Sequence, residues 1–260
     1  MQLTSELRRA LDGDEFQVHY RPIVGAAGAI EDVKALIRWN HPNRGLVMPG
    51  GFIPAAESSR LILEIGDSML RHACGEFETL TRGVPGAATL GVSVNLSTRQ
   101  LSDPRLLVTV QDSLTNARLH AGRLTLEITE STIMDDVADA TRVLKQLRSL
   151  GVKIAMDDFG TGYSSLSLLS EIPIDRLKID RSFVTGMADR PESSRMIRAI
   201  LGLAGELGLD TVVEGVEELE QHQRLRELGC QACQGFYFAK PQPAAQLVEL
   251  LQRAAHIHTV

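Results

Sequence analysis

Short apolar segments alternate with helical segments through almost the whole chain, and this alternation constrains the fold more than any other feature. Apolar runs typical of strands lie at residues 16–24, 30–39, 90–96, 124–129, 153–159, 175–180, 210–216 and 232–238. Segments with helical spacing lie at 3–11, 51–59, 61–80, 104–119, 137–150, 164–171, 192–207, 218–228 and 244–254. About eight strand–helix units over roughly 250 residues predict an α/β fold, a (β/α)8 barrel of the TIM type.

The start of the chain refines this prediction. No G-x-G-x-x-G follows the first strand, which argues against an open dinucleotide-binding sheet. Gly25-Ala-Ala-Gly28 is typical of a hairpin turn, so the first two strands are expected to pair antiparallel. No linker interrupts the chain, so residues 1–260 are expected to form one domain with a solvated tail at 255–260.

Composition excludes several classes of function. The formal net charge is −6, and no block of Lys and Arg exceeds two residues, which argues against binding to DNA or RNA polymers but allows a small phosphate ligand. No apolar run reaches the roughly 18 residues of a membrane span, and no signal peptide is visible. We therefore expect a cytoplasmic protein without a membrane segment in this chain.

The cysteines are three in number, and an odd count favours free thiols in a reducing compartment. Cys230-Gln-Ala-Cys233 has the spacing of a redox pair, but no second pair and no cluster of histidines accompanies it. We therefore expect structural thiols and no zinc site.

Two adjacent carboxylates, Asp157 and Asp158, stand where the fifth strand should end, directly before the glycine-rich turn Gly160-Thr-Gly162. Such a pair repels itself unless a cation lies between the two groups, and a divalent metal with oxygen ligands would supply one. An acidic turn that caps the next helix is the simpler alternative.

Polar residues also end the neighbouring strands, and in a barrel these strand ends meet on one face. The set comprises Asn95, Glu127, Glu130, Asp157, Asp158, Lys178, Asp180, Glu214 and Gln234. A charged residue inside an apolar run is costly unless it is paired or bound to metal, so six such strands favour a functional site.

The chemistry that these residue types suggest is metal-assisted phosphoryl transfer. Carboxylate and amide oxygens of Asn95, Glu127, Asp157 and Asp158 can hold one or two Mg²⁺ or Mn²⁺ ions. Lys178 can hold a water or stabilise a phosphate oxygen, and Glu214 can orient that water. Asp180 and Gln234 can hydrogen-bond a base or a ribose.

Several motifs together resemble the EAL-domain family, over about residues 3–243. They are Arg38-Trp39, Phe52-Ile-Pro54, Val94-Asn-Leu-Ser97, Glu127-Ile-Thr-Glu130, Asp157-Asp-Phe-Gly-Thr-Gly-Tyr-Ser-Ser165, Leu177-Lys-Ile-Asp180, Glu214-Gly-Val-Glu217 and Gln234-Gly235.

The resemblance implies a bacterial domain that hydrolyses cyclic di-GMP to linear pGpG with Mg²⁺ or Mn²⁺, in a barrel with one antiparallel strand. It places Asn95, Glu127, Asp157 and Asp158 on metal-ligand positions, and Lys178 and Glu214 on catalytic positions. It also places Leu36 on a guanine contact and Arg38 on a phosphate contact, and it implies a homodimer.

Lys34 breaks the family pattern, because Lys34-Ala35-Leu36 stands where the family has Glu-Ala-Leu. The missing glutamate is a metal ligand, and an ammonium group about 4 Å from a divalent ion is repelled by several kcal/mol even at an effective dielectric of about 20. We expect Lys34 to pair with the vacated carboxylates, so that no metal need bind. A side chain that points to the surface is the alternative.

Arg21 is a second departure, at a position where the family usually has a glutamine that touches the ligand. An arginine there can grip a phosphate or a guanine edge, or it can block the pocket.

Three functions remain open. The expected one is a receptor that binds cyclic di-GMP with lost or impaired hydrolysis. The alternatives are a working phosphodiesterase and a protein-interaction module that no longer binds nucleotide. The sequence names no protein partner, and it leaves open whether the chain stands alone or belongs to a longer sensor.

Overall fold

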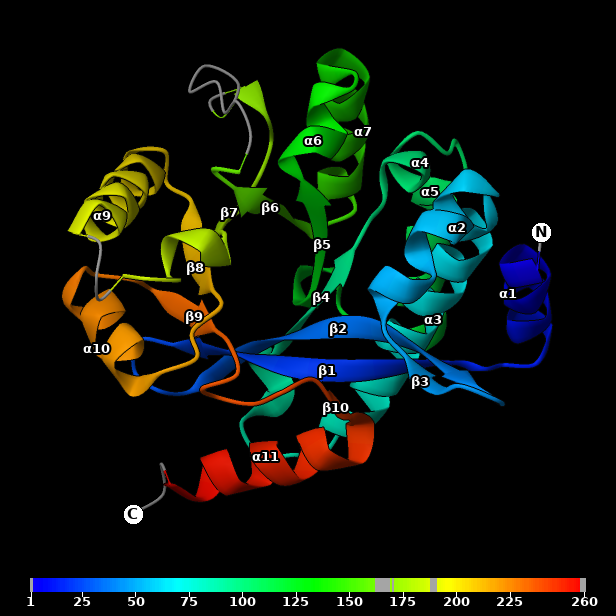
Figure 1. The fold of residues 1–260 in the computed structure, drawn as a ribbon, viewed down its shortest axis with the longest axis horizontal. Coiled ribbons are helices and arrows are strands. Elements are labelled where there is room, and N and C mark those ends of the chain that lie inside the picture. Colours follow the sequence, from blue (N-terminus) through cyan, green and yellow to red (C-terminus); the bar gives the residue numbers. More distant parts are fainter. Residues whose placement is uncertain (1, 162–168, 170, 188–190, 258–260) are drawn as a thin grey trace.

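A computed structural model describes residues 2–161, 169, 171–187 and 191–257 (Figure 1). Its strands are β1 (Phe16–Gly25), β2 (Ile30–His41), β3 (Gly45–Val47), β4 (Gly91–Asn95), β5 (Leu124–Thr129), β6 (Lys153–Phe159), β7 (Arg176–Ile179), β8 (Asp210–Glu214), β9 (Ala232–Gln234) and β10 (Gln242–Pro243). Its α-helices are α1 (Gln2–Asp12), α2 (Ile53–Ser58), α3 (Leu61–Thr81), α4 (Thr98–Leu101), α5 (Leu106–Ala117), α6 (Glu130–Met134), α7 (Val137–Ser149), α9 (Pro191–Glu206), α10 (Leu219–Glu227) and α11 (Ala244–Ile257). Short 3₁₀ turns are η1 (Pro49–Gly51), η2 (Ala87–Thr89), η3 (Ala121–Arg123) and η4 (Arg181–Phe183).

Eight of the strands close into a barrel, which confirms the predicted fold class. The hydrogen-bonded order is β1-β9-β8-β7-β6-β5-β4-β2, and the pairing of β2 with β1 completes the ring. From β2 through β4 to β9 every neighbouring pair is parallel. Parallel strands that are covered on both faces are typically rich in apolar residues, which explains the continuous apolar runs in the sequence.

β1 is the antiparallel strand of this barrel. It pairs antiparallel with both of its barrel neighbours, β2 and β9, so the predicted hairpin between the first two strands is confirmed. In the β1–β2 ladder Arg21 lies directly opposite Lys34. Because side chains alternate between the two faces of a strand, this register puts both unusual residues on the same side of the sheet.

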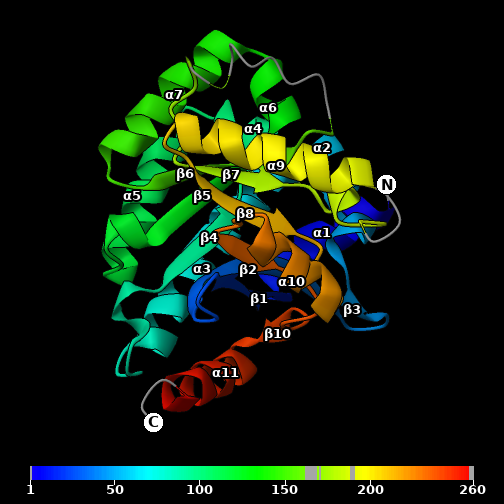
Figure 2. The ribbon, with the colours of Figure 1, turned by 90° about the vertical axis from the view of Figure 1, so that its left-hand side faces the viewer.

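The helices form a layer around the barrel (Figures 1 and 2). The large apolar core lies between the strands and this layer, with Val92, Leu126, Ile154 and Leu177 among its fully buried members. Inside the barrel the described residues form only a small apolar cluster, which consists of Ile23, Val212 and Ala232. The rest of the barrel interior is therefore open to polar side chains. No helix in the described part of the chain is long and apolar enough to span a membrane.

The segments after β7, β8 and β9 pack closely on one another through two glycines. A Cβ atom on Gly235 would lie 1.9 Å from the carbonyl oxygen of Val216, and one on Gly215, where φ is +78°, would lie 2.2 Å from Cβ of Arg181. The Val216 amide donates to the Gln234 carbonyl at 3.1 Å, and the Tyr237 amide donates to the Val216 carbonyl at 3.0 Å. These contacts fix the strand ends that carry Glu214 and Gln234.

The predicted strand at 232–238 is too long, because β9 ends at Gln234. The close approach of Gly235 to Val216 bends the chain there, and the amide of Phe238 turns back to donate to the Gly235 carbonyl at 3.2 Å. The expected strand at 210–216 likewise ends at Glu214, before the positive φ of Gly215.

Other differences concern short elements. Four elements were not predicted, because they are too short to show a hydrophobic periodicity: α4, α6, β3 and β10. The helix expected at 51–59 is divided into η1 and α2. Most of the helix expected at 164–171 lies outside the described residues, and the tail expected from 255 begins as part of α11.

Candidate functional site

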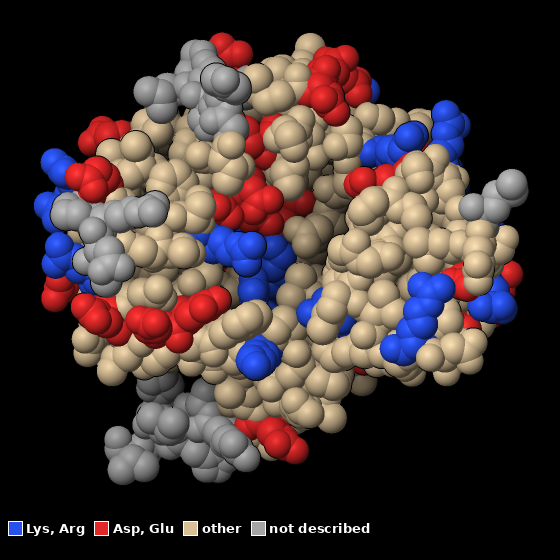
Figure 3. Space-filling view, in the orientation of Figure 1, with Lys and Arg blue, Asp and Glu red and all other residues tan. Residues whose placement is uncertain are grey.

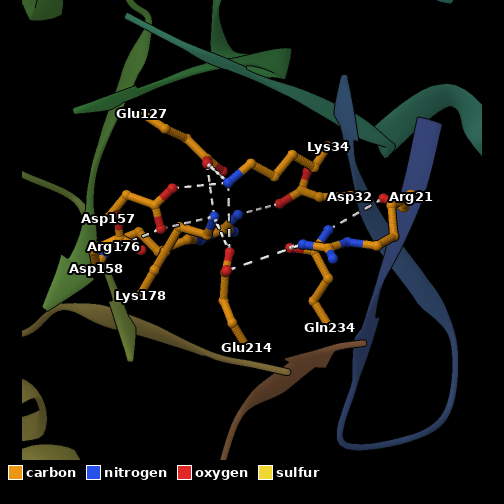
Figure 4. A network of polar contacts seen from close by, with 10 residues as sticks. All are labelled: Arg21, Asp32, Lys34, Glu127, Asp157, Asp158, Arg176, Lys178, Glu214 and Gln234. Atoms are coloured by element: carbon orange, nitrogen blue, oxygen red, sulfur yellow. Dashed lines mark hydrogen bonds and ion pairs between the residues drawn. The ribbon is translucent and has the colours of Figure 1, made fainter. Parts of the chain in front are cut away.

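Three carboxylates meet inside the barrel at the ends of parallel strands. Glu127 on β5, Asp157 on β6 and Glu214 on β8 each offer one oxygen, and these oxygens lie within 4.8 Å of one another (Figure 4). Glu127 and Asp157 are buried, and Glu214 is nearly so. We call these three residues the carboxylate cluster. In the space-filling view, acidic and basic side chains lie side by side in a hollow at the middle of the face shown (Figure 3).

Lys178, on β7, is completely buried against the carboxylate cluster. Its Nζ lies 2.6 Å from Glu127 Oε2, 3.2 Å from Asp157 Oδ1 and 2.5 Å from Glu214 Oε1. An ammonium group has three N–H donors, so these three carboxylates account for all of them.

Lys34, on β2, points into the same cluster (Figure 4). Its Nζ lies 2.7 Å from Glu127 Oε2, 2.8 Å from Asp157 Oδ2 and 3.5 Å from Glu214 Oε1. The residue is only 5% exposed, so the alternative that Lys34 faces the surface is wrong. Two ammonium groups therefore face three carboxylates.

These charges shift one another's ionisation. Burial alone would lower the pKa of Lys34, but the carboxylates of Glu127, Glu214 and Asp157 outweigh it and raise this pKa well above its usual value. Burial would raise the pKa of Asp157, but the ammonium groups of Lys178 and Lys34 hold it far below its usual value. The pKa of Glu214 is lowered in the same way. Lys34, Asp157 and Glu214 therefore stay charged near neutral pH.

A divalent metal does not fit among these residues while Lys34 is there. The carboxylate oxygens are the donors that Mg²⁺ or Mn²⁺ would need, but Lys34 and Lys178 already bind all three carboxylates. A metal ion at this place would lie within a few ångströms of two ammonium groups, and each would repel it by several kcal/mol.

Arg21 and Arg38 are two further cations of the site, and each has a donor without a partner in the described structure. Arg21 Nη2 donates to Gln234 Oε1 at 3.0 Å and lies 4.0 Å from Glu214 Oε2. Arg38 Nη1 donates to the Ile37 carbonyl at 2.8 Å. Within the described chain, Nε of each arginine is buried without a hydrogen-bond partner. Burial first, and then the charge of Arg21, lower the pKa of Arg38.

Leu36 and Asn95 line a cavity of about 640 Å³ beside the strand ends. Apolar side chains from α2 and α3 form one wall, and hydroxyl groups of Ser97, Thr98 and Thr132 contribute to the other. Asn95 is exposed at the end of β4, opposite Glu127 in the ladder, and no side-chain hydrogen bond joins it to the carboxylate cluster in the described structure.

Three other expected residues are not members of the carboxylate cluster. Asp158 is the next-to-last residue of β6 and has a left-handed backbone at φ +56°. Its amide donates to Asp157 Oδ1 at 3.1 Å, and burial together with the charge of Asp157 raises its pKa. Asp180 caps η4, where its carboxylate accepts from the Ser182 amide at 2.9 Å. Glu130 is buried as the first residue of α6.

Three further polar residues inside the barrel were not predicted from the sequence. Asp32 Oδ2 accepts from Arg176 Nη1, and both side chains are buried on the same face as the lysines (Figure 4). His19 is buried on β1, opposite Leu36, and burial first, then Arg38, lower its pKa. Alternation could have found all three, because each lies two residues from a residue already identified as inward.

Comparison with known proteins identifies the family. The sequence profile of the EAL domain matches residues 4–241. The chain is 41% identical over 249 residues to the bifunctional diguanylate cyclase/cyclic di-GMP phosphodiesterase MucR of Pseudomonas aeruginosa, over 95% of this chain and 36% of that protein. It is 40% identical over 253 residues to the cyclic di-GMP phosphodiesterase NbdA of the same organism, over 97% of this chain and 32% of that protein. The chain thus spans about a third of these relatives.

Solved structures agree with this assignment. The PaMucR phosphodiesterase in its c-di-GMP complex matches with a TM-score of 0.90 and 41% identity, over 95% of this chain and 100% of that one. The EAL domain of FimX from Xanthomonas citri, in complex with c-di-GMP, matches with a TM-score of 0.85 and 26% identity, over 93% and 94% of the two chains. The chain therefore belongs to the EAL domain family, whose relatives include cyclic di-GMP phosphodiesterases.

Proposed function

We propose that this domain is a cyclic di-GMP receptor that binds its ligand without metal and hydrolyses it negligibly. The observation that carries the proposal is the position of Lys34, whose ammonium group lies within hydrogen-bonding distance of Glu127 and Asp157. A fixed cation there offsets the negative charge that would otherwise repel a phosphate. It does not supply the Lewis acid or the activated water that a bound metal ion provides.

Arg21 and Arg38 are proposed to hold the phosphates. Both guanidinium groups are largely buried, and each has a buried Nε without a partner in the described chain, so a ligand oxygen would satisfy donors that are otherwise left unpaired. Arginine donors suit phosphate oxygens because two parallel N–H groups can engage two oxygens at once. Gln234 is fully buried and holds Arg21 in place, because its Oε1 accepts from Arg21 Nη2 and its Nε2 donates to the Arg21 carbonyl at 3.4 Å. Its part in ligand binding is therefore proposed to act through Arg21.

The cavity beside the strand ends is proposed to take one guanine. Its volume of about 640 Å³ and its lining of apolar residues with a few hydroxyls suit a flat base with polar edges. Leu36 would contact the ring, and Asn95 lies where this cavity meets the strand ends. Asp180 would contact a base or a ribose through Oδ2, while its Oδ1 keeps the cap on η4.

A working phosphodiesterase is the second candidate, and the carboxylate cluster is the observation that favours it. In that case Mg²⁺ or Mn²⁺ would have to displace Lys34 from Glu127 and Asp157, with Asn95 and Asp158 as further ligands. Lys178 and Glu214 would then have the catalytic roles that the family resemblance gives them.

We also propose that residues 1–260 form a single domain. From the resemblance alone we propose a homodimer, and a protein signalling partner belongs to the same proposal.

The proposal is tested by titrating cyclic di-GMP into the protein in a calorimeter, first in EDTA and then in Mn²⁺, and by analysing both mixtures for pGpG by chromatography. We expect equal binding in the two buffers and no pGpG. Abundant pGpG in Mn²⁺ would overturn the receptor assignment in favour of the phosphodiesterase. Absence of heat in both buffers would overturn nucleotide binding altogether and leave the interaction module.

Two arginine variants make this experiment specific. Arg38→Gln should weaken binding about 10- to 100-fold, because a hydrogen bond to a charged group contributes roughly 1.5–3 kcal/mol. Arg82→Gln makes the same chemical change at an exposed position after α3, where Arg82 reaches only Glu78 at 3.7 Å, and should bind like the wild type. Equal loss in both variants would mean that Arg38 has no special role.

A further inference from the structure

Cys230 and Cys233 bring their sulfur atoms together in the fold. The two Sγ atoms are 3.7 Å apart, and both residues are 3% exposed. Cys230 follows α10 and Cys233 lies on β9. The bend at Gln231 between them brings the two sulfur atoms close together. A disulfide needs the same two atoms at about 2.05 Å, so only a short movement separates the thiols from a bond.

The backbone around this pair is held firmly. The Gln231 carbonyl accepts from the Ala26 amide at 2.8 Å, and Gln231 Oε1 accepts from the Thr211 amide at 2.6 Å. Cys233 is paired with Val24 of β1 and with Val213 of β8. Two thiols that the surrounding sheet already holds face to face have a high effective concentration for each other, which favours an intramolecular bond over other reactions.

We propose that Cys230 and Cys233 form a reversible intramolecular disulfide, with a peroxide as the oxidant. The Cys230 thiolate attacks one oxygen of hydrogen peroxide, the O–O bond breaks, and the leaving hydroxide is protonated to water. Cys233 then loses its proton, and its sulfur attacks the Cys230 sulfenic acid with release of a second water. Each thiol gives up one electron and one proton, and the peroxide is reduced to two waters.

The roles of the two sulfurs follow from their surroundings. The hydrogen bond with Cys233 lowers the pKa of Cys230, whereas the same hydrogen bond and burial raise the pKa of Cys233. Cys230 is therefore the sulfur that reacts first with the oxidant. Because Cys233 is paired with a strand on each side and the backbone near Cys230 is also hydrogen-bonded, rotation of the Cys230 side chain is the movement that brings the two sulfurs together.

Cys74 provides an internal control on the same chain. It is buried on α3, and burial raises the pKa of its thiol to about 12, which makes it a poor nucleophile. The only contact between cysteine sulfurs in the described part of the chain is that of Cys230 with Cys233.

The experiment treats the full chain with hydrogen peroxide, removes the oxidant, unfolds the protein in N-ethylmaleimide and counts the attached labels by mass spectrometry. The reduced protein carries labels on its three cysteines. The oxidised wild type should keep only the label on Cys74, and dithiothreitol should restore the other two. Cys74→Ser should lose both of its labels under the same treatment.

Single variants distinguish a disulfide from simple oxidation. Cys230→Ser and Cys233→Ser cannot form the bond. The wild-type peptide that carries both residues should therefore lose the mass of two hydrogens, reversibly with dithiothreitol, and neither variant should show this change. Wild-type protein that keeps all three labels would overturn the proposal. So would a loss of labels accompanied by added oxygen atoms instead of the loss of two hydrogens. Neither result depends on whether cyclic di-GMP binds.

Discussion

At the scale of single residues, Lys34 has the largest effect on the charge of the site. Its neighbours on β2 keep the strand in register, so its side chain projects into the barrel interior. There Lys34 puts a positive charge at the point where three carboxylates converge. The sequence predicted this pairing with Glu127 and Asp157, because alternation along a strand fixes which residues point inward.

Lys34→Glu should convert the domain into a metal-dependent phosphodiesterase. Removing the ammonium group and adding a carboxylate changes the interaction with a divalent ion by several kcal/mol, so we expect pGpG formation in Mn²⁺ to rise at least about 100-fold over the wild type. Chromatography of the reaction mixture in Mn²⁺ and in EDTA measures the gain.

The matched control for that variant is Lys34→Met, which removes the ammonium group without adding a ligand. It should give no pGpG, and it should bind cyclic di-GMP in EDTA more weakly than the wild type because the uncompensated carboxylates repel phosphate. If Lys34→Glu stays inactive in Mn²⁺ while remaining folded, residue 34 is not what limits hydrolysis.

At the scale of elements, the rim of the barrel depends on the contacts between the segments after β7, β8 and β9. The strand–helix order, the hairpin and the convergence of strand ends could be predicted, because each follows from local periodicity and known barrel geometry. The early end of β9 could not, since it is set by the approach of Gly235 to Val216, which are distant in the sequence. Nor could the joining of Glu214 to Glu127 and Asp157, because that depends on side-chain reach across the barrel.

Gly235→Ala should destabilise the domain and weaken ligand binding. An added Cβ would lie 1.9 Å from the Val216 carbonyl oxygen, so the backbone must shift, and overpacking of this kind costs about 1–3 kcal/mol. The shift moves Gln234 away from Arg21. Denaturant unfolding and calorimetry measure the two effects.

Gly202→Ala is the corresponding control. Gly202 lies on α9 with open space around its Cβ position, so alanine there should raise the free energy of unfolding by up to about 1 kcal/mol and leave binding unchanged. Similar behaviour of the two variants would show that the rim contact has no special importance.

At the scale of the whole molecule, the barrel carries its charges in its interior as well as on its surface. Beneath the carboxylate cluster lies the buried pair of Asp32 and Arg176, and the small apolar cluster of Ile23, Val212 and Ala232 fills another part of the interior. Buried charges of this kind bind each other strongly only while every member is ionised. The stability of the whole fold is therefore linked to the ionisation of a few side chains.

The free energy of unfolding should fall steeply as the pH drops below about 4. Asp157 and Glu214 have lowered pKa values in the folded protein, so their contribution is fully present above the pKa of the unfolded chain, about 4. It is lost as the pH falls from there toward their folded pKa values. Denaturant unfolding at a series of pH values from 7 to 3 measures this slope, and Asp157→Asn should make it shallower. An unchanged slope in that variant would contradict the assignment.

The position of Lys34 among an otherwise complete set of carboxylates has a genetic consequence. Lysine and glutamate codons differ only in their first base, so a single transition mutation exchanges one residue for the other. Glu127, Asp157 and Glu214 already converge on that point, and Lys178 is in place beside them. Under the proposed receptor function, a population of cells that carries this gene is thus one point mutation away from a protein that would destroy the messenger that the present one binds, and selection for loss of the messenger would enrich that mutation.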